Sequence, residues 1–285
     1  MTIRELIKKT EAELSEVAIP NFISDIKALV AFSLQTSLAQ LYAMQEDEVN
    51  FNLEQYWELI REYKNGKPLQ QITNRQYFYG NEFYVDSNVL IPRYETEELV
   101  DYINVIIDDR KTKKPGPLTL IDIGTGSGAI AISIGLENPD LKIYASDISE
   151  PALKVTEKNL TQLDCQNVEL LQGNMLEPFI KQKIKADILV CNPPYIPKQQ
   201  KISARVKDYE PHVALFGGED GLFFYHEIFK NWEKVMKEDG ILCFEHGYDQ
   251  KRQLEKLARH YFPKKKYKFT KDVNKKWRML FIYLL

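Results

Sequence analysis

Apolar residues recur at helical intervals over the first seventy positions of the chain. One stripe, spaced by three and four residues, predicts a single amphipathic helix over residues 23–41. A second helix is predicted over about 53–63, ending before Asn65-Gly66, a pair typical of helix C-termini. We see no catalytic constellation in these helices. We therefore expect residues 1–73 to form a small helical domain that recognises a substrate rather than carrying out chemistry.

The pattern changes between residues 74 and 91, where aromatic and β-branched side chains gather on both sides of a turn. Segments 76–79 and 82–85 favour strands, and Gly80-Asn81 between them favours a tight turn. These residues predict a β-hairpin that connects the helical domain to the rest of the chain. A helix is predicted next, over residues 95–109, and then a short surface loop over 111–116.

From about residue 118 onward, short apolar strands alternate with helices. Strands are predicted at 118–123, 141–146, 168–171, 186–191 and 241–245, and helices at 129–136, 150–163, 221–237 and 250–260. Such alternation indicates an α/β fold with a mostly parallel, doubly wound sheet. Two final strands, near 267–270 and 279–284, have no helix between them and predict an antiparallel hairpin at one edge. We expect residues 92–285 to form this domain.

Composition excludes several classes of protein. The 285 residues are 44% hydrophobic and 28% charged, as in a folded globular chain, and no apolar run approaches the roughly 18 residues of a membrane-spanning helix. The first twenty residues contain no apolar stretch of signal-peptide length. Three cysteines at distant spacings suggest neither a disulfide framework nor a zinc site. We expect reduced thiols, no membrane association and a cytoplasmic location.

Charge is distributed unevenly along the chain. Residues 1–73 hold seven Lys or Arg and eleven Asp or Glu, a net charge of −4, whereas residues 251–278 hold twelve basic residues and two acidic ones. The overall net charge of −3 argues against a protein that coats nucleic acid. The basic segment keeps a nucleic-acid role open, although such a run is usually a solvated face.

A glycine-rich segment, Asp122–Gly128, joins a predicted strand to a predicted helix. Glycines there let the backbone turn tightly and approach a ligand closely beside a helix N-terminus. The next strand ends at Asp147, whose carboxylate can accept hydrogen bonds from a ribose diol. Because Gly124, Gly126 and Ala129 also satisfy the dinucleotide pattern, this motif alone leaves the choice between NAD and S-adenosylmethionine open.

A second motif, Asn192-Pro193-Pro194-Tyr195, follows a predicted strand directly. Ligands of doubly wound sheets bind at the carboxyl ends of the strands, so Asn192 should face the ligand of the glycine-rich segment. The side-chain oxygen of Asn192 and the main-chain oxygen of Pro193 can accept both N–H bonds of a planar amide or aromatic amine, aiming its lone pair at a methyl donor. The prolines rigidify the loop, and Tyr195 offers a ring for stacking. The motif thus indicates an S-adenosylmethionine-dependent amino-methyltransferase.

Both motifs resemble those of enzymes that methylate exocyclic or amide nitrogens, and further segments resemble the HemK/PrmC family of protein-(glutamine-N5) methyltransferases. These segments are 68–72, 90–93, 95–97, 210–211, 217–221 and 245–247, with Asp272 and Arg278. The resemblance covers nearly the whole chain, in order. It implies S-adenosyl-L-methionine as cofactor, S-adenosyl-L-homocysteine as product, and the glutamine of the Gly-Gly-Gln loop of peptide chain release factors as target. It also implies a Rossmann-like, seven-stranded sheet, joined by the hairpin to an N-terminal helical domain.

The resemblance assigns site residues by motif matching. The candidate catalytic residues are Asn192, Pro193, Pro194 and Tyr195, and the candidate cofactor-binding residues are Gly124, Thr125, Gly126, Ser127, Gly128, Asp147, Asn174, Met175 and Asn192. No metal is expected. The chain departs from the family pattern at Asn174, where members often have an acid, and at Tyr94, which interrupts the usual proline-containing segment.

Alternative functions stay open at this stage. Adenine-N6 and guanine-N2 methyltransferases of nucleic acids use the same four-residue motif, and a ribosomal-protein glutamine methyltransferase is a closer variant. A binding module that keeps only the nucleotide pocket would require a damaged motif, whereas residues 192–195 are intact. His212 and His246 have no suitably spaced metal partner. We expect a monomer whose partners are release factors rather than nucleic acid.

Overall fold

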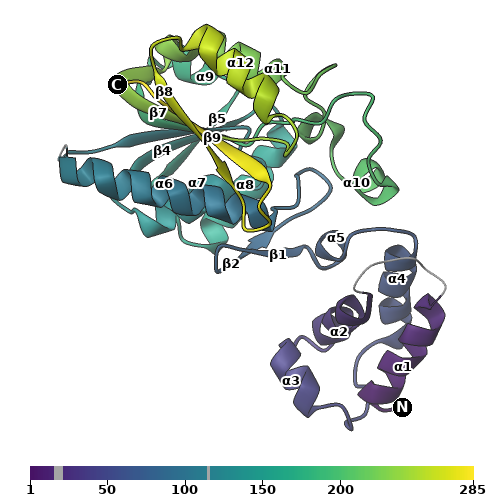
Figure 1. Ribbon diagram of the computed structural model, residues 1–285. Helices are drawn as coiled ribbons and strands as arrows, with labels where there is room; N and C mark the ends of the chain where they lie inside the picture. Colours follow the sequence, from purple (N-terminus) through teal and green to yellow (C-terminus); the bar gives the residue numbers. More distant parts are fainter. Residues whose placement is uncertain (16–21, 114–115) are drawn as a thin grey trace. The chain divides into compact units, whose positions relative to one another are not determined.

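The computed structural model describes residues 1–15, 22–113 and 116–285 (Figure 1). The chain divides into two compact units. One comprises Met1–Arg75 with Ser203–Tyr209, and the other comprises Gln76–Ile202 with Glu210–Leu285. Within the described ranges, none of the helices combines the length and apolar character needed to cross a bilayer.

The first unit consists of short helices around one apolar core. They are α1 (Ile3–Leu14), α2 (Phe22–Ser33), α3 (Leu38–Ala43), α4 (Leu53–Lys64), α5 (Leu69–Thr73) and α10 (Ala204–Tyr209). A capping box between Thr2 and Glu5 starts α1, because each side chain accepts a hydrogen bond from the other residue's backbone N–H. The buried hydroxyls of Thr10 and Tyr56 are hydrogen-bonded at 2.7 Å, which ties α1 to α4.

The structure corrects the single helix predicted over residues 23–41. The stripe is split between α2 and α3, because Gln35 adopts a left-handed backbone conformation (φ 54°) and Ser37 caps a new helix. Ile23 and Leu38, both on the predicted buried face, are therefore 47% and 48% exposed. The helix predicted over about 53–63 is confirmed as α4.

Helix α10 packs into this unit although it lies far along the sequence. The Tyr209 hydroxyl donates to the main-chain oxygen of Asn65 (3.1 Å), and the Tyr209 main-chain oxygen accepts from Gln71 Nε2 (2.7 Å). The guanidinium of Arg205 lies 5.1 Å from the ring centroid of Tyr63. Periodicity did not predict this helix, because it has only six residues and is held by partners remote in sequence.

The second unit is a three-layer structure built on a seven-stranded sheet. In spatial order the strands are β5 (Val168–Gln172), β4 (Lys142–Asp147), β3 (Thr119–Ile123), β6 (Ala186–Cys191), β7 (Met236–Glu245), β9 (Trp277–Tyr283) and β8 (Lys266–Lys271). The first five are parallel, and β9 runs antiparallel to both of its neighbours. The predicted doubly wound sheet and its antiparallel edge hairpin are confirmed.

Helices cover both faces of this sheet (Figure 1). One face carries α6 (Tyr94–Lys113), α7 (Ala129–Glu137) and α8 (Glu150–Gln162), and the other carries α9 (Glu177–Lys181), α11 (Phe223–Asn231) and α12 (Lys251–Tyr261). Strand β3 is buried on both sides, with Leu120 in one apolar core and Ile121 in the other. This explains why its sequence is apolar apart from Thr119 and Asp122.

The predicted hairpin is confirmed as β1 (Arg75–Phe78) and β2 (Asn81–Tyr84). Its turn lies one residue earlier than expected, because Tyr79 and Gly80 both have positive φ, 49° and 73°. The aromatic rings of Phe78 and Phe83 join the core beneath α6.

Two element boundaries differ from the prediction. The helix expected over 221–237 is shorter, since α11 gives way to a 3-10 turn at Trp232–Lys234 and β7 already begins at Met236. The loop expected over 111–116 is partly helical, since α6 continues to Lys113. Residues 114 and 115 of that loop lie outside the described ranges.

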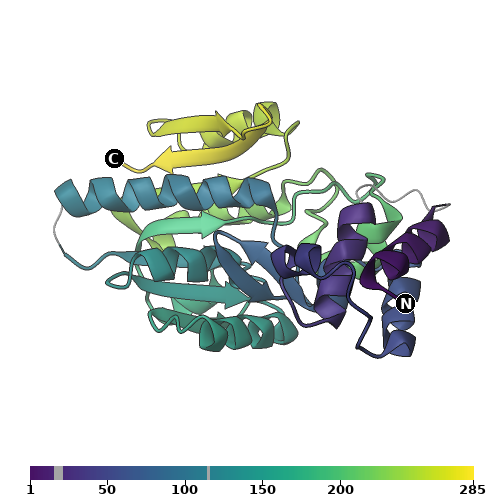
Figure 2. The ribbon, with the colours of Figure 1, turned by 90° about the horizontal axis from the view of Figure 1, so that it is seen from below.

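The basic segment includes an edge strand of the sheet. The hairpin of β8 and β9, drawn in yellow, ends the sheet on one side (Figure 2). Lys266, Lys268 and Lys271 are exposed along β8. Lysines on a sheet edge discourage pairing with a strand of another molecule. In addition, Lys251 Nζ lies 3.7 Å from the centroid of the Trp277 ring. Edge protection therefore accounts for part of the basic run without a nucleic-acid ligand.

Candidate active site

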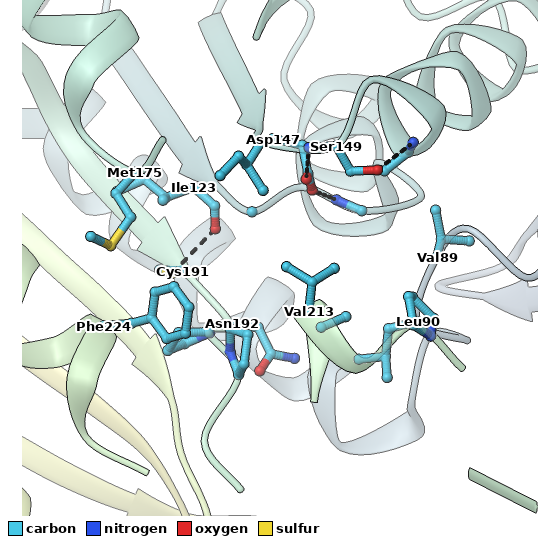
Figure 3. Close-up of a pocket in the computed structure, with 18 of the residues that line it drawn as sticks. Val89, Leu90, Ile123, Asp147, Ser149, Met175, Cys191, Asn192, Val213 and Phe224 are labelled. Carbon is cyan, nitrogen blue, oxygen red and sulfur yellow. Dashed lines mark hydrogen bonds between the residues drawn. The ribbon is translucent and has the colours of Figure 1, made fainter. Parts of the chain in front are cut away.

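A pocket opens at the carboxyl ends of β3, β4 and β6. Its empty space, counted together with the open mouth, is about 770 Å³. Figure 3 shows Met175 and Phe224 on one side and Val89 and Leu90 on the other, with Asp147 and Asn192 across from one another between them. The lining also includes Asn88, Ile123, Gly124, Gly126, Ile148, Ser149, Ala152, Gly173, Asn174, Cys191, Pro193, Pro194, Pro211, Val213 and Ala214.

Strand register brings the two sequence motifs together. Ile123 at the end of β3 pairs with Cys191 at the end of β6, so Gly124 and Asn192 leave adjacent parallel strands at the same level. Both residues line the pocket. The prediction that the glycine-rich segment and the four-residue motif share one edge of the sheet is confirmed.

The glycines of the first motif have different roles. Gly124, Gly126 and Gly128 all have positive φ, 71°, 58° and 82°, which favours glycine at each position. A Cβ on Gly124 or Gly126 would meet no protein atom within 4 Å, because these two residues face the pocket. A Cβ on Gly128 would lie 2.6 Å from Thr156 Cγ2. The lack of side chains at Gly124 and Gly126 thus leaves room for a ligand beside the backbone, and Gly128 allows close packing at the start of α7.

Asp147 ends β4 with its carboxylate beside this loop. One carboxylate oxygen accepts a hydrogen bond from the Gly126 backbone N–H (3.0 Å), and the other accepts from that of Ser149 (2.9 Å). Burial raises the pKa of Asp147, and these backbone donors oppose that shift. Ser149 in turn caps α8 by accepting from the Ala152 N–H (3.2 Å).

A second carboxyl group, Asp122, lies fully buried under the same loop and was not among the candidate site residues. It accepts a hydrogen bond from Thr125 Oγ1 at 2.7 Å. Burial raises the pKa of Asp122 to about 7, and the charge of Asp147 acts in the same direction. Thr125 and Ser127 are themselves buried and do not line the pocket. Thr125 and Ser127 therefore support the loop conformation without facing the pocket.

The loop after β5 supplies the two remaining cofactor candidates. Asn174 and Met175 both line the pocket, and Met175 has a positive φ of 47°. The backbone N–H of the preceding Gly173 donates to the main-chain oxygen of Asp147 (3.0 Å). This bond holds the loops after β4 and β5 together at the pocket wall.

Asn192, the first residue of the segment Asn192–Tyr195, lies across the pocket from Asp147 (Figure 3). Asn192 Nδ2 donates to Thr96 Oγ1 at 3.4 Å. Among the described residues, neither the side-chain oxygen of Asn192 nor the main-chain oxygen of Pro193 accepts a hydrogen bond. Pro193 and Pro194 line the pocket, but Tyr195 does not; its hydroxyl lies 3.4 Å from a carboxylate oxygen of Glu245. Two oxygens are thus available to accept from a ligand.

A second glycine-rich loop, which contains Gly217 and Gly221, packs closely against the backbone of this segment. A Cβ on Gly217 would lie 2.3 Å from the main-chain oxygen of Pro194, and one on Gly221 would lie 2.2 Å from that of Tyr195. Gln250 Nε2 donates to the same Tyr195 oxygen (2.9 Å). The backbone of the four-residue motif is therefore fixed by close contacts before any ligand arrives.

Thr96, Glu245 and Gln250 contact the motif but were not among the candidate site residues. Thr96 and Glu245 fall in the family-like segments 95–97 and 245–247, but the residues that they contact lie 50 to 96 positions away, so no local spacing identifies these contacts. Burial raises the pKa of Glu245, while the hydrogen bond from Thr96 and the charge of Arg278 oppose the shift. His246 is buried outside the pocket, where burial lowers its pKa to about 4.

Comparisons with known proteins agree with this arrangement. A family model described as "PrmC N-terminal domain" matches residues 5–73, and one described as "Methyltransferase domain" matches residues 116–279. The chain is 37% identical to the release factor glutamine methyltransferase of Bacillus subtilis (strain 168), covering 98% of this chain and 96% of that one. It is 38% identical to the release factor glutamine methyltransferase of Staphylococcus aureus (strain NCTC 8325 / PS 47), covering 73% of each.

Among solved structures, the hMettl16 catalytic domain, crystallised with MAT2A 3'UTR hairpin 1, superposes with a TM-score of 0.57. The two are 17% identical, and the match covers 73% of this chain and 76% of that one. At this identity the likeness shows a shared methyltransferase fold and nothing about the substrate.

Proposed function

The chain belongs to the release factor glutamine methyltransferase family, and on this premise we propose that it methylates the side-chain nitrogen, N5, of the glutamine in the Gly-Gly-Gln motif of peptide chain release factors. The methyl donor is S-adenosyl-L-methionine, and the product is S-adenosyl-L-homocysteine. One observation carries the proposal: a glycine-walled pocket and the intact segment Asn192–Tyr195 share one edge of the sheet in a chain that matches its relatives over nearly its full length.

The pocket fits a nucleoside-containing cofactor. Gly124 and Gly126 let a ligand approach the backbone, Asp147 offers carboxylate oxygens to a ribose diol, and Met175 and Ile148 provide apolar surface for a base. When bound, S-adenosyl-L-methionine supplies an electrophilic methyl group on a sulfonium centre. We assign its binding to Gly124, Thr125, Gly126, Ser127, Gly128, Asp147, Asn174, Met175 and Asn192, of which Thr125, Ser127 and Gly128 act by shaping the loop.

The catalytic task of this chain is to orient a poor nucleophile. The lone pair of an amide nitrogen is delocalised into its carbonyl group. The side-chain oxygen of Asn192 and the main-chain oxygen of Pro193 accept the two N–H bonds of the substrate amide, which favours pyramidalisation and aims the lone pair into the pocket. Pro194 stiffens the loop, and Tyr195 anchors it toward Glu245. After transfer the nitrogen is cationic and acidic, so it can lose its proton without a strong base.

We assign substrate recognition to the helical domain of residues 1–73, with residues 74–91 as connector and 92–285 as the methyltransferase domain. The match of residues 5–73 to the PrmC N-terminal domain supports this assignment. The net charge of −4 over residues 1–73 suits a basic surface on the protein substrate. Because α10 belongs to the same compact unit as this helical domain, we include α10 in the surface assigned to substrate recognition.

A methyl-transfer assay with labelled S-adenosyl-L-methionine tests the proposal. We expect label on purified release factor and none on DNA or RNA. Label on nucleic acid, with none on release factor, would instead support the amino-methylation of bases. The Asn192→Ala variant serves as the control for labelling that does not depend on the site.

A further inference from the structure

A buried chain of hydrogen bonds runs behind Asn192, away from the pocket. Asn192 Nδ2 donates to Thr96 Oγ1 (3.4 Å), and Thr96 Oγ1 donates to a carboxylate oxygen of Glu245 (2.6 Å). The second carboxylate oxygen of Glu245 faces the Tyr195 hydroxyl at 3.4 Å. Thr96 and Glu245 are 4% and 2% exposed and do not line the pocket, so neither is placed to touch a bound ligand.

The direction of each hydrogen bond in this chain follows from the chemistry of its groups. Ionised Glu245, the form favoured by the charge of Arg278, can only accept, so it takes the single hydroxyl proton of Thr96. The Thr96 oxygen can then act toward Asn192 only as an acceptor. Asn192 must therefore turn its NH₂ group toward Thr96, and its Oδ1 is left facing the pocket. Without the Thr96 hydroxyl, this series of hydrogen bonds no longer distinguishes the Asn192 oxygen from the Asn192 NH₂ group.

We propose that Thr96, held in one hydrogen-bonding direction by Glu245, is a positioning residue that keeps the Asn192 oxygen directed at the substrate nitrogen. This inference rests on the proposed function. An Asn192 side chain that rotated by half a turn would present NH₂ to the substrate NH₂, two donors facing each other. Thr96 thus selects the acceptor orientation that methyl transfer requires, from helix α6 and 96 positions away in sequence.

The test compares Thr96→Val, which keeps the shape but removes the hydroxyl, with Thr96→Ser, which keeps the hydroxyl. We expect Thr96→Val to lower kcat for release factor methylation by about 10- to 100-fold, the effect of one misplaced buried hydrogen bond. Its calorimetric Kd for S-adenosyl-L-homocysteine should stay unchanged, and Thr96→Ser should retain most of the activity. Thr270→Val, which removes a buried hydroxyl at the sheet edge, is the matched control and should leave kcat unchanged.

A double-mutant cycle separates positioning from general structural support. If Thr96 acts through Asn192, adding Thr96→Val to Asn192→Ala should produce no further loss of kcat. Glu245→Leu removes the acceptor of the Thr96 proton and also the partner of the Tyr195 hydroxyl, so part of its loss should persist in the Asn192→Ala background. Losses that multiply across the two sites, or full activity in Thr96→Val, would overturn the proposal.

A spectroscopic readout keeps this inference separate from the proposed function. The side-chain NH₂ resonances of Asn192, assigned by their loss in Asn192→Ala, should shift in Thr96→Val and stay in place in Thr96→Ser. Unshifted resonances in Thr96→Val would show that the bond to Thr96 does not hold the amide. If wild-type protein fails to methylate release factor while the resonances shift as expected, the proposed function is wrong and the positioning contact stands.

Discussion

Arg93 and Glu210 form an ion pair beside the pocket, with Nη2 of the arginine 2.5 Å from a carboxylate oxygen. The Glu210 side chain is buried, and its other oxygen accepts a hydrogen bond from the Ile91 backbone N–H (3.2 Å). Leu90 lines one wall of the pocket shortly before Arg93, and Pro211 lines another directly after Glu210. The pair therefore fastens two wall segments that are 117 positions apart in sequence.

Removing the guanidinium should loosen both walls. In Arg93→Ala the buried carboxylate keeps only one backbone donor, so the free energy of unfolding should fall by about 1–3 kcal/mol. The affinity for S-adenosyl-L-homocysteine should fall as well, because the two wall segments are no longer fastened. Urea unfolding and calorimetric titration measure the two effects. Lys198→Ala, which breaks an exposed ion pair with Glu219, is the control and should change neither. An unaltered affinity in Arg93→Ala would contradict this role.

The carboxylate of Asp147 should contribute directly to cofactor affinity. Asp147→Asn removes its charge and one of its acceptors for a ribose hydroxyl, so we expect the Kd for S-adenosyl-L-homocysteine to rise about 10- to 100-fold. Asp140→Asn, which removes an exposed carboxylate paired with Lys111, is the control. Calorimetric titration of both variants checks this. Equal affinities for the two variants would argue against a ribose contact at Asp147.

The side chain of Asn192 should matter for turnover more than for binding. Asn192→Ala removes one of the two oxygens that accept from the substrate amide, so kcat should fall by at least about 10- to 100-fold. Asn192 also belongs to the residues assigned to the cofactor, but the glycine backbone and Asp147 remain, so the affinity for S-adenosyl-L-homocysteine should fall by less than kcat does. Steady-state kinetics with release factor, combined with calorimetry, separates the two quantities. Undiminished kcat in this variant would refute the assigned chemistry.

Asp122 should make the stability of the protein depend on pH. Its folded-state pKa of about 7 lies above its ordinary value, so between about pH 4 and pH 7 the folded protein binds more protons than the unfolded chain. The contribution of this group to the free energy of unfolding therefore falls as pH rises through that window. Asp122→Asn keeps an acceptor for Thr125 and cannot titrate, so its stability relative to wild type should increase from about pH 4 to about pH 7. Urea unfolding across the window checks this, and a constant difference would count against it.

Local sequence patterns predicted the parallel sheet well, because its strands are continuous apolar runs bounded by turn residues. They failed where one residue changes the backbone without changing the apolar spacing. Gln35 interrupts a stripe that reads as a single helix, since left-handed conformations are rare outside glycine and leave no periodic signal. They also missed α10, whose six residues are too few for periodicity and whose contacts are with Gln71 and other residues more than a hundred positions away.

In the candidate site, too, local motifs were predictable and long-range contacts were not. Gly124, Gly126, Asp147 and Asn192 were predictable, because tight turns and strand ends leave local motifs and parallel strands align them at one edge. The contacts that hold those motifs in place were not. Thr96 and its partners act through contacts between distant segments, and only the folded chain brings such segments together.

The most direct test of the proposed reaction is mass spectrometry of a release factor after incubation with the protein and S-adenosyl-L-methionine. We predict one added CH₂ group, located by fragmentation to the side chain of the glutamine in the Gly-Gly-Gln motif, and its loss with Asn192→Ala. A modification on any other residue, or an unmodified release factor alongside methylated nucleic acid, would contradict the proposed reaction.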